Sequence, residues 1–211
     1  TCALPISRAF DTACRSTICN HLHDLGTPEH LIQLVASWHE NTNYNLVFRG
    51  RTTKVRVGKG LRQGCKIAPL LWIIFMDRFL HMLADKTGPG WIAEAVTIYA
   101  DDVHFGCAFR SPHEFRTHLT NLGHAVDCLE SLGLSISYSK SFMTLRYTST
   151  NPRPVLKGCI QRTSAGTSLL VPRQDGSSTP LPLKTKGRYL GAVISYHSFE
   201  AQTWAHRKKA G

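Results

Sequence analysis

The stretch TIYADDVHF (Thr97–Phe105) sets two adjacent aspartates, Asp101 and Asp102, inside a run of strand-forming apolar residues. The apolar residues on either side predict two short strands joined across the pair. Two like charges on one tight turn repel each other, so the arrangement costs stability unless a cation binds. The stretch is therefore either a polar turn, where Asp is common, or half of a metal site.

Mg²⁺ suits such a pair because it prefers oxygen ligands and shares its shell with water and substrate phosphates. In two-metal nucleotidyl transfer the ions lie about 3.5–4 Å apart and hold the attacking and leaving oxygens. That chemistry needs a further carboxylate, normally from another strand. Taken alone, the Asp pair favours the polar turn. Evidence for a metal site has to come from the rest of the sequence.

The composition limits the classes of protein to consider. The chain has 211 residues, 42% of them hydrophobic, with 25 Lys and Arg against 14 Asp and Glu. The length suits one domain or slightly more, and the net charge of +11 agrees with a polyanionic partner. No signal peptide or membrane span is visible, which predicts an intracellular protein, in the nucleus or cytoplasm, without membrane contact. Seven scattered cysteines indicate free thiols rather than a zinc site.

The order of predicted elements indicates an α+β fold with an antiparallel sheet backed by helices on one face. Helices are predicted over residues 9–25, 28–40, 67–83 and 112–133, with Thr27 and Ser111 as N-caps of the second and the last. Strands are predicted over residues 44–60 as a hairpin, beside the Asp pair, over 135–147 and over 188–195. Residues 148–187, rich in Ser, Thr, Pro and Gly, predict a variable, mobile hairpin or insert.

A basic track runs through the predicted hairpin and beyond it. It contains no acidic residue, and its cations are Arg49, Arg51, Lys54, Arg56, Lys59, Arg62 and Lys66. On alternating strands several of these side chains would share one face and follow a phosphate backbone. The alternative is a solvated hairpin face, but the absence of acids favours nucleic acid.

Five stretches, in this order along the chain, resemble the motifs of reverse transcriptases. They are SRAFDTA (Ser7–Ala13), GLRQGCKIAPLLWIIFMDRF (Gly60–Phe79), YADD (Tyr99–Asp102), LGLSISYSKSFM (Leu132–Met143) and RYLGAVIS (Arg188–Ser195). The set is most similar to the enzymes of non-LTR (LINE-type) retrotransposons, with group II intron enzymes as near neighbours. The resemblance covers nearly the whole chain.

The resemblance implies a right-hand polymerase palm with part of the fingers. Residues 7–147 would form the palm and fingers core, and 188–211 the primer-grip strand and the start of the thumb. The implied activity is RNA-directed DNA polymerisation with Mg²⁺, or alternatively Mn²⁺. The implied partners are an RNA template, a DNA primer and dNTPs, with the oligomeric state left open.

The resemblance also assigns roles to single residues. Asp101 would ligate the metal, and Asp102 would assist the metal site and the primer end. Lys140 would protonate the pyrophosphate leaving group or orient the triphosphate. A solvated lysine on a turn is the alternative for Lys140.

Further matching positions concern the nucleotide and the primer. Phe10 falls at the family's steric gate against a ribose 2′-OH, with a core Phe as the alternative. Gln63 and Gly64 would contact the incoming nucleotide and the template base, with a helix-entry turn as the alternative. Asp11 is interpreted as a helix cap rather than a metal ligand. The primer-grip positions are Tyr189, Leu190 and Gly191.

The family's first motif reads Asp-x-x-x-Ala-Phe-Asp, and counting back from Asp11 places Pro5 at its first aspartate. The third metal ligand is therefore absent. A decayed element, a repurposed binding protein and a non-native N-terminus are the competing explanations. The third is preferred, because TCALPI (residues 1–6) back-translates to ACG TGT GCT CTT CCG ATC, which resembles the end of a common sequencing adapter. Different codons, or genomic DNA continuous through them, would exclude it.

The chain is accordingly expected to be an N-terminally truncated fragment with little or no polymerase activity, lacking a complete metal site, thumb and fingertips. The rival from another class is a non-catalytic, maturase-like RNA-binding module that kept the fold and the basic track. The intact YADD turn counts against this rival, since a binding module has no need of it.

Overall fold

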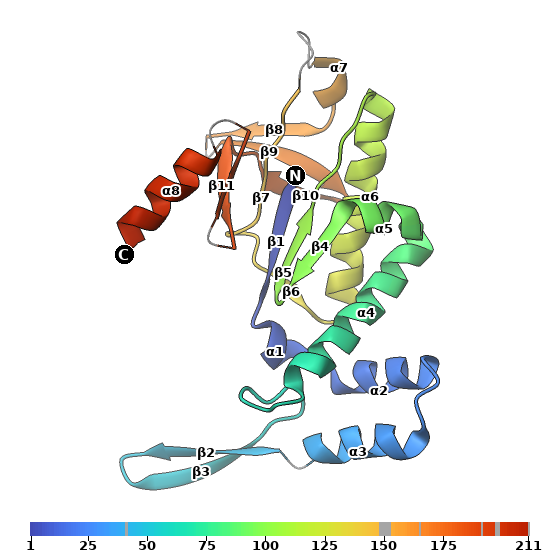
Figure 1. Cartoon of the computed structure of the whole chain (residues 1–211), viewed down its shortest axis with the longest axis vertical. Coiled ribbons are helices and arrows are strands. Elements are labelled where there is room, and N and C mark those ends of the chain that lie inside the picture. Colours follow the sequence, from blue (N-terminus) through green and yellow to red (C-terminus); the bar gives the residue numbers. More distant parts are fainter. Residues whose placement is uncertain (41, 148–152, 165, 191, 197–198, 211) are drawn as a thin grey trace. The chain divides into compact units, whose positions relative to one another are not determined.

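The computed structural model describes the chain except for residues 41, 148–152, 165, 191, 197–198 and 211 (Figure 1). The described chain divides into two compact units, and each is described by itself. Unit 1 contains Thr1–Ile6, Ala84–Asp127 and Ile136–Gly211. Unit 2 contains Ser7–Leu83 and Cys128–Ser135.

A sheet built around β1 (Cys2–Ser7) organises unit 1. Its strand order is β4 (Val96–Tyr99), β5 (Asp102–Phe105), β1 and β6 (Ser135–Ile136), and β7 (Phe142–Met143) also pairs with β1. The pairings of β5 with β4 and with β1 are antiparallel. Side chains on both faces of β1 are buried, as expected for a central strand. Residues 2–6, assigned above to a non-native N-terminus, therefore form the middle of this sheet, and their origin stays a prediction for the nucleotide sequence to test.

Helix α6 (Pro112–Ser131) begins at the predicted cap. Ser111 Oγ accepts a hydrogen bond from the Glu114 N–H at 3.1 Å, and the Glu114 carboxylate accepts one from the Arg110 N–H at 2.6 Å. The two side chains satisfy backbone donors at the helix start, close to the reciprocal pattern of a capping box. The Ser111 prediction is confirmed.

Helix α6 covers one face of the sheet. Its residues Phe115, Leu119 and Leu122 are buried, and together with Cys2 and Phe105 of the sheet they line a cavity of about 50 Å³. A helix whose apolar side chains share a cavity with strand residues is packed on those strands. The predicted α+β class with an antiparallel sheet is confirmed, while the palm and fingers assignment stays a prediction.

The segment 148–187 contains more regular structure than its composition predicts. After the short helix α7 (Arg153–Leu156), its described residues form an antiparallel sheet of β8 (Ile160–Thr163), β9 (Gly166–Pro172) and β10 (Ser178–Pro182). Leu169, Val171 and Leu181 are fully buried at 0% exposure. This sheet therefore buries apolar side chains where the sequence predicts a mobile hairpin or insert, and Val171 packs against α6 at Gly123.

The last part of unit 1 is a hairpin followed by a helix. β11 (Lys186–Tyr189) pairs antiparallel with β12 (Ala192–Ser195), and α8 (Phe199–Ala210) follows. The sequence predicts a single strand over 188–195, which is wrong. Leu190, with a φ of 48°, starts the turn that divides it.

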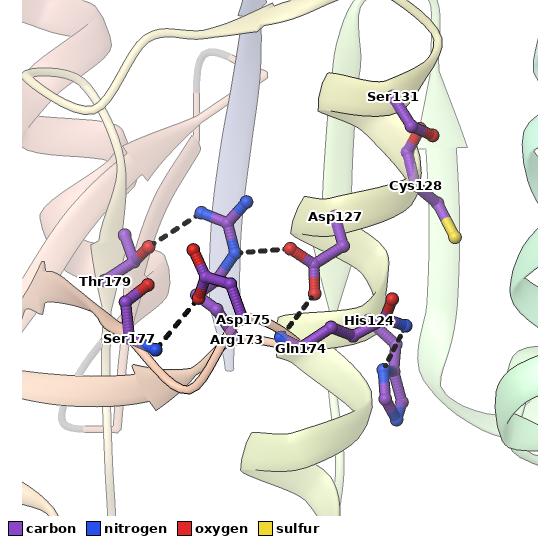
Figure 2. Close-up of polar contacts among 9 residues, drawn as sticks. All are labelled: His124, Asp127, Cys128, Ser131, Arg173, Gln174, Asp175, Ser177 and Thr179. Carbon is purple, nitrogen blue, oxygen red and sulfur yellow. Dashed lines mark hydrogen bonds and ion pairs between the residues drawn. The ribbon is translucent and has the colours of Figure 1, made fainter.

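The β9–β10 turn is fixed to α6 by a partly buried ion pair (Figure 2). Arg173 Nε donates to Asp127 Oδ1 at 2.6 Å, and the Gln174 N–H donates to Asp127 Oδ2 at 3.1 Å. The Arg173 and Asp127 side chains are only 15% and 18% exposed. Next to them on α6, a Cβ on Gly123 would collide with the carbonyl oxygen of Pro172. Glycine is therefore what allows β9 to approach the helix so closely.

Gly123→Ala is expected to destabilise the chain by about 2 kcal/mol. The new methyl meets a backbone oxygen that cannot rotate away, an overpacking cost of about 3 kcal/mol, offset by about 1 kcal/mol of improved helix propensity. Urea denaturation followed by circular dichroism measures the change. Gly90→Ala in α5 (Pro89–Ala95) is the matched control, because nothing lies within 4 Å of its new Cβ. Equal stability of the two variants would contradict the close approach.

Unit 2 contains α1 (Ala9–Thr12), α2 (Arg15–Asp24), α3 (Glu29–His39), the hairpin β2 (Asn43–Phe48) and β3 (Arg51–Arg56), and α4 (Ala68–Thr87) as far as Leu83. The helix predicted over 9–25 is broken, because Ala13 has an extended backbone with ψ 126°. The prediction of Thr27 as an N-cap is wrong. Pro28 occupies that position with ψ 134°, and no side chain caps α3.

Arg15 holds the ends of several unit 2 elements together. Its guanidinium donates to the carbonyl oxygens of Gly60 at 2.8 Å, His39 at 2.9 Å and Val57 at 3.0 Å. His39 is the last residue of α3, and Val57 and Gly60 follow β3. The single side chain thus fixes how the hairpin leaves α3 and returns.

No helix in the described part of the chain is long and apolar enough to cross a membrane.

Candidate active site

The Asp pair lies on a two-residue turn between β4 and β5 in unit 1. Tyr99 pairs with Asp102, which leaves Ala100 and Asp101 as the loop. Ala100 has a φ of 52°, a left-handed conformation that costs a residue with a Cβ about 1–2 kcal/mol. The carbonyl oxygen of Asp101 accepts a hydrogen bond from the Ile6 N–H at 2.8 Å, which holds the turn against β1. Such local strain is typical of functional sites.

The position of the family's first aspartate lies next to this turn. In the register of β1 and β5, Pro5 is directly opposite Asp102. Directly opposed residues have Cβ atoms about 4.5–5.5 Å apart on the same face of a sheet. Proline supplies no carboxylate here and no N–H, and it is unusual in a strand that is paired on both sides. Within the described residues, no third His, Cys, Asp or Glu joins Asp101 and Asp102 in a metal-sized group.

Electrostatics distinguish Asp102 from an ordinary surface carboxylate. Partial burial raises the pKa of Asp102, the nearby charge of Asp101 raises it further, and the charge of Lys140 lowers it. Lys140 is exposed on the turn that follows β6, where its N–H donates to Ser137 O at 2.9 Å. Lys140 thus lies near enough to act on Asp102 while its ammonium stays in solvent. A cation beside the pair would relieve the repulsion in the same way.

Tyr189 of the Tyr-Leu-Gly segment lies against β5. Its hydroxyl donates to the carbonyl oxygen of Asp102 at 3.5 Å, and its ring centroid is 5.1 Å from that of His104. Burial and the charge of Asp102 both raise the pKa of Tyr189. Leu190 is 47% exposed at the turn, and Gly191 lies outside the described residues. The structure therefore brings Tyr189 to the Asp pair, although the motifs are far apart in sequence.

The residues matched to nucleotide binding lie in unit 2. Phe10 is half-buried and stacks on Trp72, with ring centroids 5.3 Å apart. Gln63 Nε2 donates to Asp11 Oδ1 at 3.1 Å, and Gly64 is exposed with a φ of 82°. The interpretation of Asp11 as a helix cap is wrong, because it lies inside α1 and accepts this bond instead. The Ala-Phe-Asp and Arg-Gln-Gly motifs are thus in direct contact.

Gly60 is a site residue whose role the sequence reasoning missed. Its N–H donates to Ala13 O at 2.8 Å, and the following Leu61 N–H donates to Phe10 O at 2.6 Å. Its φ is 87°, and an added Cβ would lie 2.5 Å from the carbonyl oxygen of Asp11. The two glycines of GLRQG were the available signal, but only the second was given a role.

The basic track is exposed throughout, and it divides between two faces. Lys54 and Arg56 lie opposite Asn45 and Asn43, so the two cations share one face of the hairpin. Arg51, which pairs with Phe48, is an odd number of positions away from both cations along β3, so its side chain belongs to the other face. In the loop, the Arg49 guanidinium lies 5.3 Å from the Phe48 ring centroid. The exposed cations that follow the hairpin are Lys59, Arg62 and Lys66.

The comparisons with known proteins agree with the motifs. The family model "Reverse transcriptase (RNA-dependent DNA polymerase)" matches residues 2–194, a range that includes residues 2–6 of the segment 1–6 assigned above to a non-native N-terminus. The chain is 27% identical over 143 residues, 66% of its length, to the Retrovirus-related Pol polyprotein from type-2 retrotransposable element R2DM of Drosophila melanogaster. It is 28% identical over 106 residues, 48% of its length, to the Retrovirus-related Pol polyprotein from type-1 retrotransposable element R2 of Popillia japonica.

The matched stretches cover 13% and 18% of those two polyproteins, so the chain corresponds to a small part of each. The family match extends over far more than half of the chain and includes the Asp turn, the Arg-Gln-Gly segment and the Tyr-Leu-Gly hairpin. The chain therefore belongs to the reverse transcriptase family, as a reverse transcriptase domain of the non-LTR retrotransposon type predicted from its motifs.

Proposed function

We propose that the chain is the palm and part of the fingers of an RNA-directed DNA polymerase that copies retrotransposon RNA into DNA. The observation that carries the proposal is the register of β1 and β5, which sets the first-motif position, Pro5, opposite Asp102. In the parent enzyme a carboxylate at that position would complete the pair on the turn. The chain as given lacks it and is proposed to be inactive for that reason.

The donor set fits Mg²⁺, or Mn²⁺, because Asp101 and Asp102 offer only carboxylate oxygens. Bound there, the ions would stabilise charge on the attacking and leaving oxygens of nucleotidyl transfer. Lys140 would orient the triphosphate or protonate the leaving pyrophosphate. Tyr189 would support the primer end, since it contacts the backbone of Asp102.

The residues proposed to bind the nucleotide are Phe10, Gln63 and Gly64. Phe10 would exclude a ribose 2′-OH, and its stacking on Trp72 supports a fixed ring orientation. Gln63 and Gly64 would contact the incoming nucleotide and the template base. The exposed Gly64 leaves room for a close approach to its backbone, because nothing lies within 4 Å of a Cβ placed there.

Binding of dNTPs tests the proposal against a non-catalytic, maturase-like RNA-binding module. That alternative is favoured by the incomplete carboxylate set and the exposed basic hairpin. A fluorescent dNTP would be titrated onto the Pro5→Asp chain with and without Mg²⁺, in parallel with a short RNA. Mg²⁺-dependent dNTP binding supports the polymerase. RNA binding together with no dNTP binding supports the binding module.

The double variant Lys54→Ala/Arg56→Ala is expected to bind RNA about tenfold more weakly in 0.1 M salt. Each lost phosphate contact also reduces the slope of log affinity against log salt by about 0.7 for a single strand, so the slope should fall by about 1.4. Fluorescence anisotropy over a range of salt concentrations measures both quantities.

The matched control is Lys157→Ala/Arg162→Ala, which removes the same charge from exposed positions of unit 1. It is expected to change the affinity much less. If the two double variants weakened binding equally, net charge and not the hairpin would account for the interaction.

A further inference from the structure

Three metal-binding side chains converge on one point where α2 and α4 lie together in unit 2. His21 Nε2 lies 2.7 Å from Asp77 Oδ2, and His81 Nδ1 lies 3.4 Å from the same oxygen. One ligand atom of each residue lies within 4.8 Å of the ligand atoms of the other two. Asp77 falls within the Gly60–Phe79 motif, but that resemblance gives it no role, and His21 and His81 lie outside all five motifs.

The helices hold the three groups in fixed positions. Asp77 and His81 are four residues apart on α4, so they lie on the same helix face. The neighbouring Phe75 and Phe79 are fully buried at 0% exposure, which anchors this turn of α4. His21 comes from α2, and its ring centroid lies 5.2 Å from that of His81. A site on two anchored helices needs little rearrangement to accept a ligand.

The hydrogen bonding of His21 is incomplete. Its side chain is 2% exposed, and its Nδ1 is buried without a hydrogen-bond partner in the described part of the chain. The nitrogen that contacts Asp77 is Nε2, so an ion bound there would displace the His21–Asp77 hydrogen bond. His81 Nδ1 also lies 2.9 Å from the backbone oxygen of Asp77, and an ion bound to this nitrogen would displace that contact.

One side of the cluster is accessible from solvent. The Asp77 and His81 side chains are 39% and 58% exposed, in contrast to His21. An ion can therefore enter from that side and keep water as a further ligand. Three protein ligands with one open position is a common arrangement around zinc.

We propose that His21, Asp77 and His81 form a binding site for a divalent transition-metal ion, with Zn²⁺ as the best fit. Two imidazole nitrogens and one carboxylate oxygen suit Zn²⁺, whereas Mg²⁺ prefers oxygen ligands alone. Bonds of about 2.0–2.1 Å in a tetrahedral shell separate neighbouring ligand atoms by about 3.3 Å. The 3.4 Å separation agrees with that value, whereas the hydrogen-bonded pair at 2.7 Å has to move apart when the ion replaces the proton. The ion would link α2 to α4, independently of polymerase activity.

Zn²⁺ titration of the tag-free chain in competition with a chromophoric chelator tests the site. One ion per chain is expected, with binding at least about tenfold weaker in His81→Ala, a loss of about 1.4 kcal/mol. His81 is well exposed, so its replacement should leave the fold intact, which circular dichroism verifies. His23→Ala is the matched control, because His23 is an exposed histidine on the same helix as His21 and should bind unchanged.

Co²⁺ as a spectroscopic substitute separates this site from the free cysteines. A nitrogen and oxygen ligand set gives visible d–d bands without thiolate charge-transfer absorption, and these bands should be lost in His81→Ala. Undiminished binding in His81→Ala, or a thiolate spectrum, would overturn the proposal. Loss of ion binding in Asp101→Ala would instead place the ion at the Asp101–Asp102 turn, and this result would also overturn the proposal. Retention of the ion in Asp101→Ala supports a site separate from the polymerase site.

Discussion

The Pro5→Asp chain is expected to bind Mn²⁺ at least about tenfold more tightly than the chain as given, a gain of about 1.4 kcal/mol. The reason is the register of β1 and β5, in which position 5 lies opposite Asp102. A carboxylate there joins the pair on the same face of the sheet and adds a third oxygen ligand. Electron paramagnetic resonance of free Mn²⁺ measures the affinity.

Pro5→Asn is the matched control for this gain. It has nearly the shape of the aspartate variant and restores the N–H that proline lacks, but it adds no charge. Its Mn²⁺ affinity is expected to remain that of the chain as given. An equal gain with Asn would show that relief of the proline, rather than the carboxylate, was responsible.

Gly60→Ala is expected to destabilise the chain by about 3 kcal/mol. Gly60 has a φ of 87°, which costs an L-residue about 1–2 kcal/mol. The new Cβ would lie 2.5 Å from the backbone oxygen of Asp11, and relieving such an overlap costs about 1–3 kcal/mol. The shift would separate the Arg-Gln-Gly segment from the Ala-Phe-Asp segment. Urea denaturation measures the loss.

Gly58→Ala provides the control two residues away. Gly58 has no left-handed φ, and nothing lies within 4 Å of its added Cβ. Its stability is expected to stay within about 0.5 kcal/mol of the original. Similar losses in both variants would contradict the contact with Asp11 as the reason for glycine at position 60.

Local signals in the sequence were sufficient where one short segment determines its own structure. The hairpin around Arg49 and Gly50 follows from alternating residues on both sides of a two-residue turn. The start of α6 follows from Ser111 and Glu114, whose side chains satisfy neighbouring backbone groups. The α+β class follows from the order of such elements.

Contacts between distant segments explain what the sequence did not reveal. Asp11 was interpreted as a cap because its partner, Gln63, is 52 positions away and enters only through the fold. The strand predicted over 188–195 is divided at Leu190, whose left-handed conformation no propensity rule favours. In the β8–β10 sheet, β8 is short and β9 and β10 contain proline, so their alternation was too weak to recognise.

The candidate sites show the same difference between local signals and contacts that only the fold creates. Asp101 and Asp102 are adjacent, so the sequence alone could predict them as a candidate pair. The pairing of Pro5 with Asp102 required the strand register. At the proposed zinc site, Asp77 and His81 share a helix face, but His21 lies 56 positions before Asp77 and joins them only through packing.

RNA-templated primer extension by the Pro5→Asp chain tests the central claim most directly. A DNA primer annealed to RNA would be offered one complementary dNTP with Mg²⁺ or Mn²⁺, to the chain as given, to Pro5→Asp and to Pro5→Asp/Asp101→Ala. The account predicts that only Pro5→Asp adds the complementary nucleotide. Robust extension by the chain as given, or extension by Pro5→Asp that persists without the Asp101 carboxylate, would contradict it.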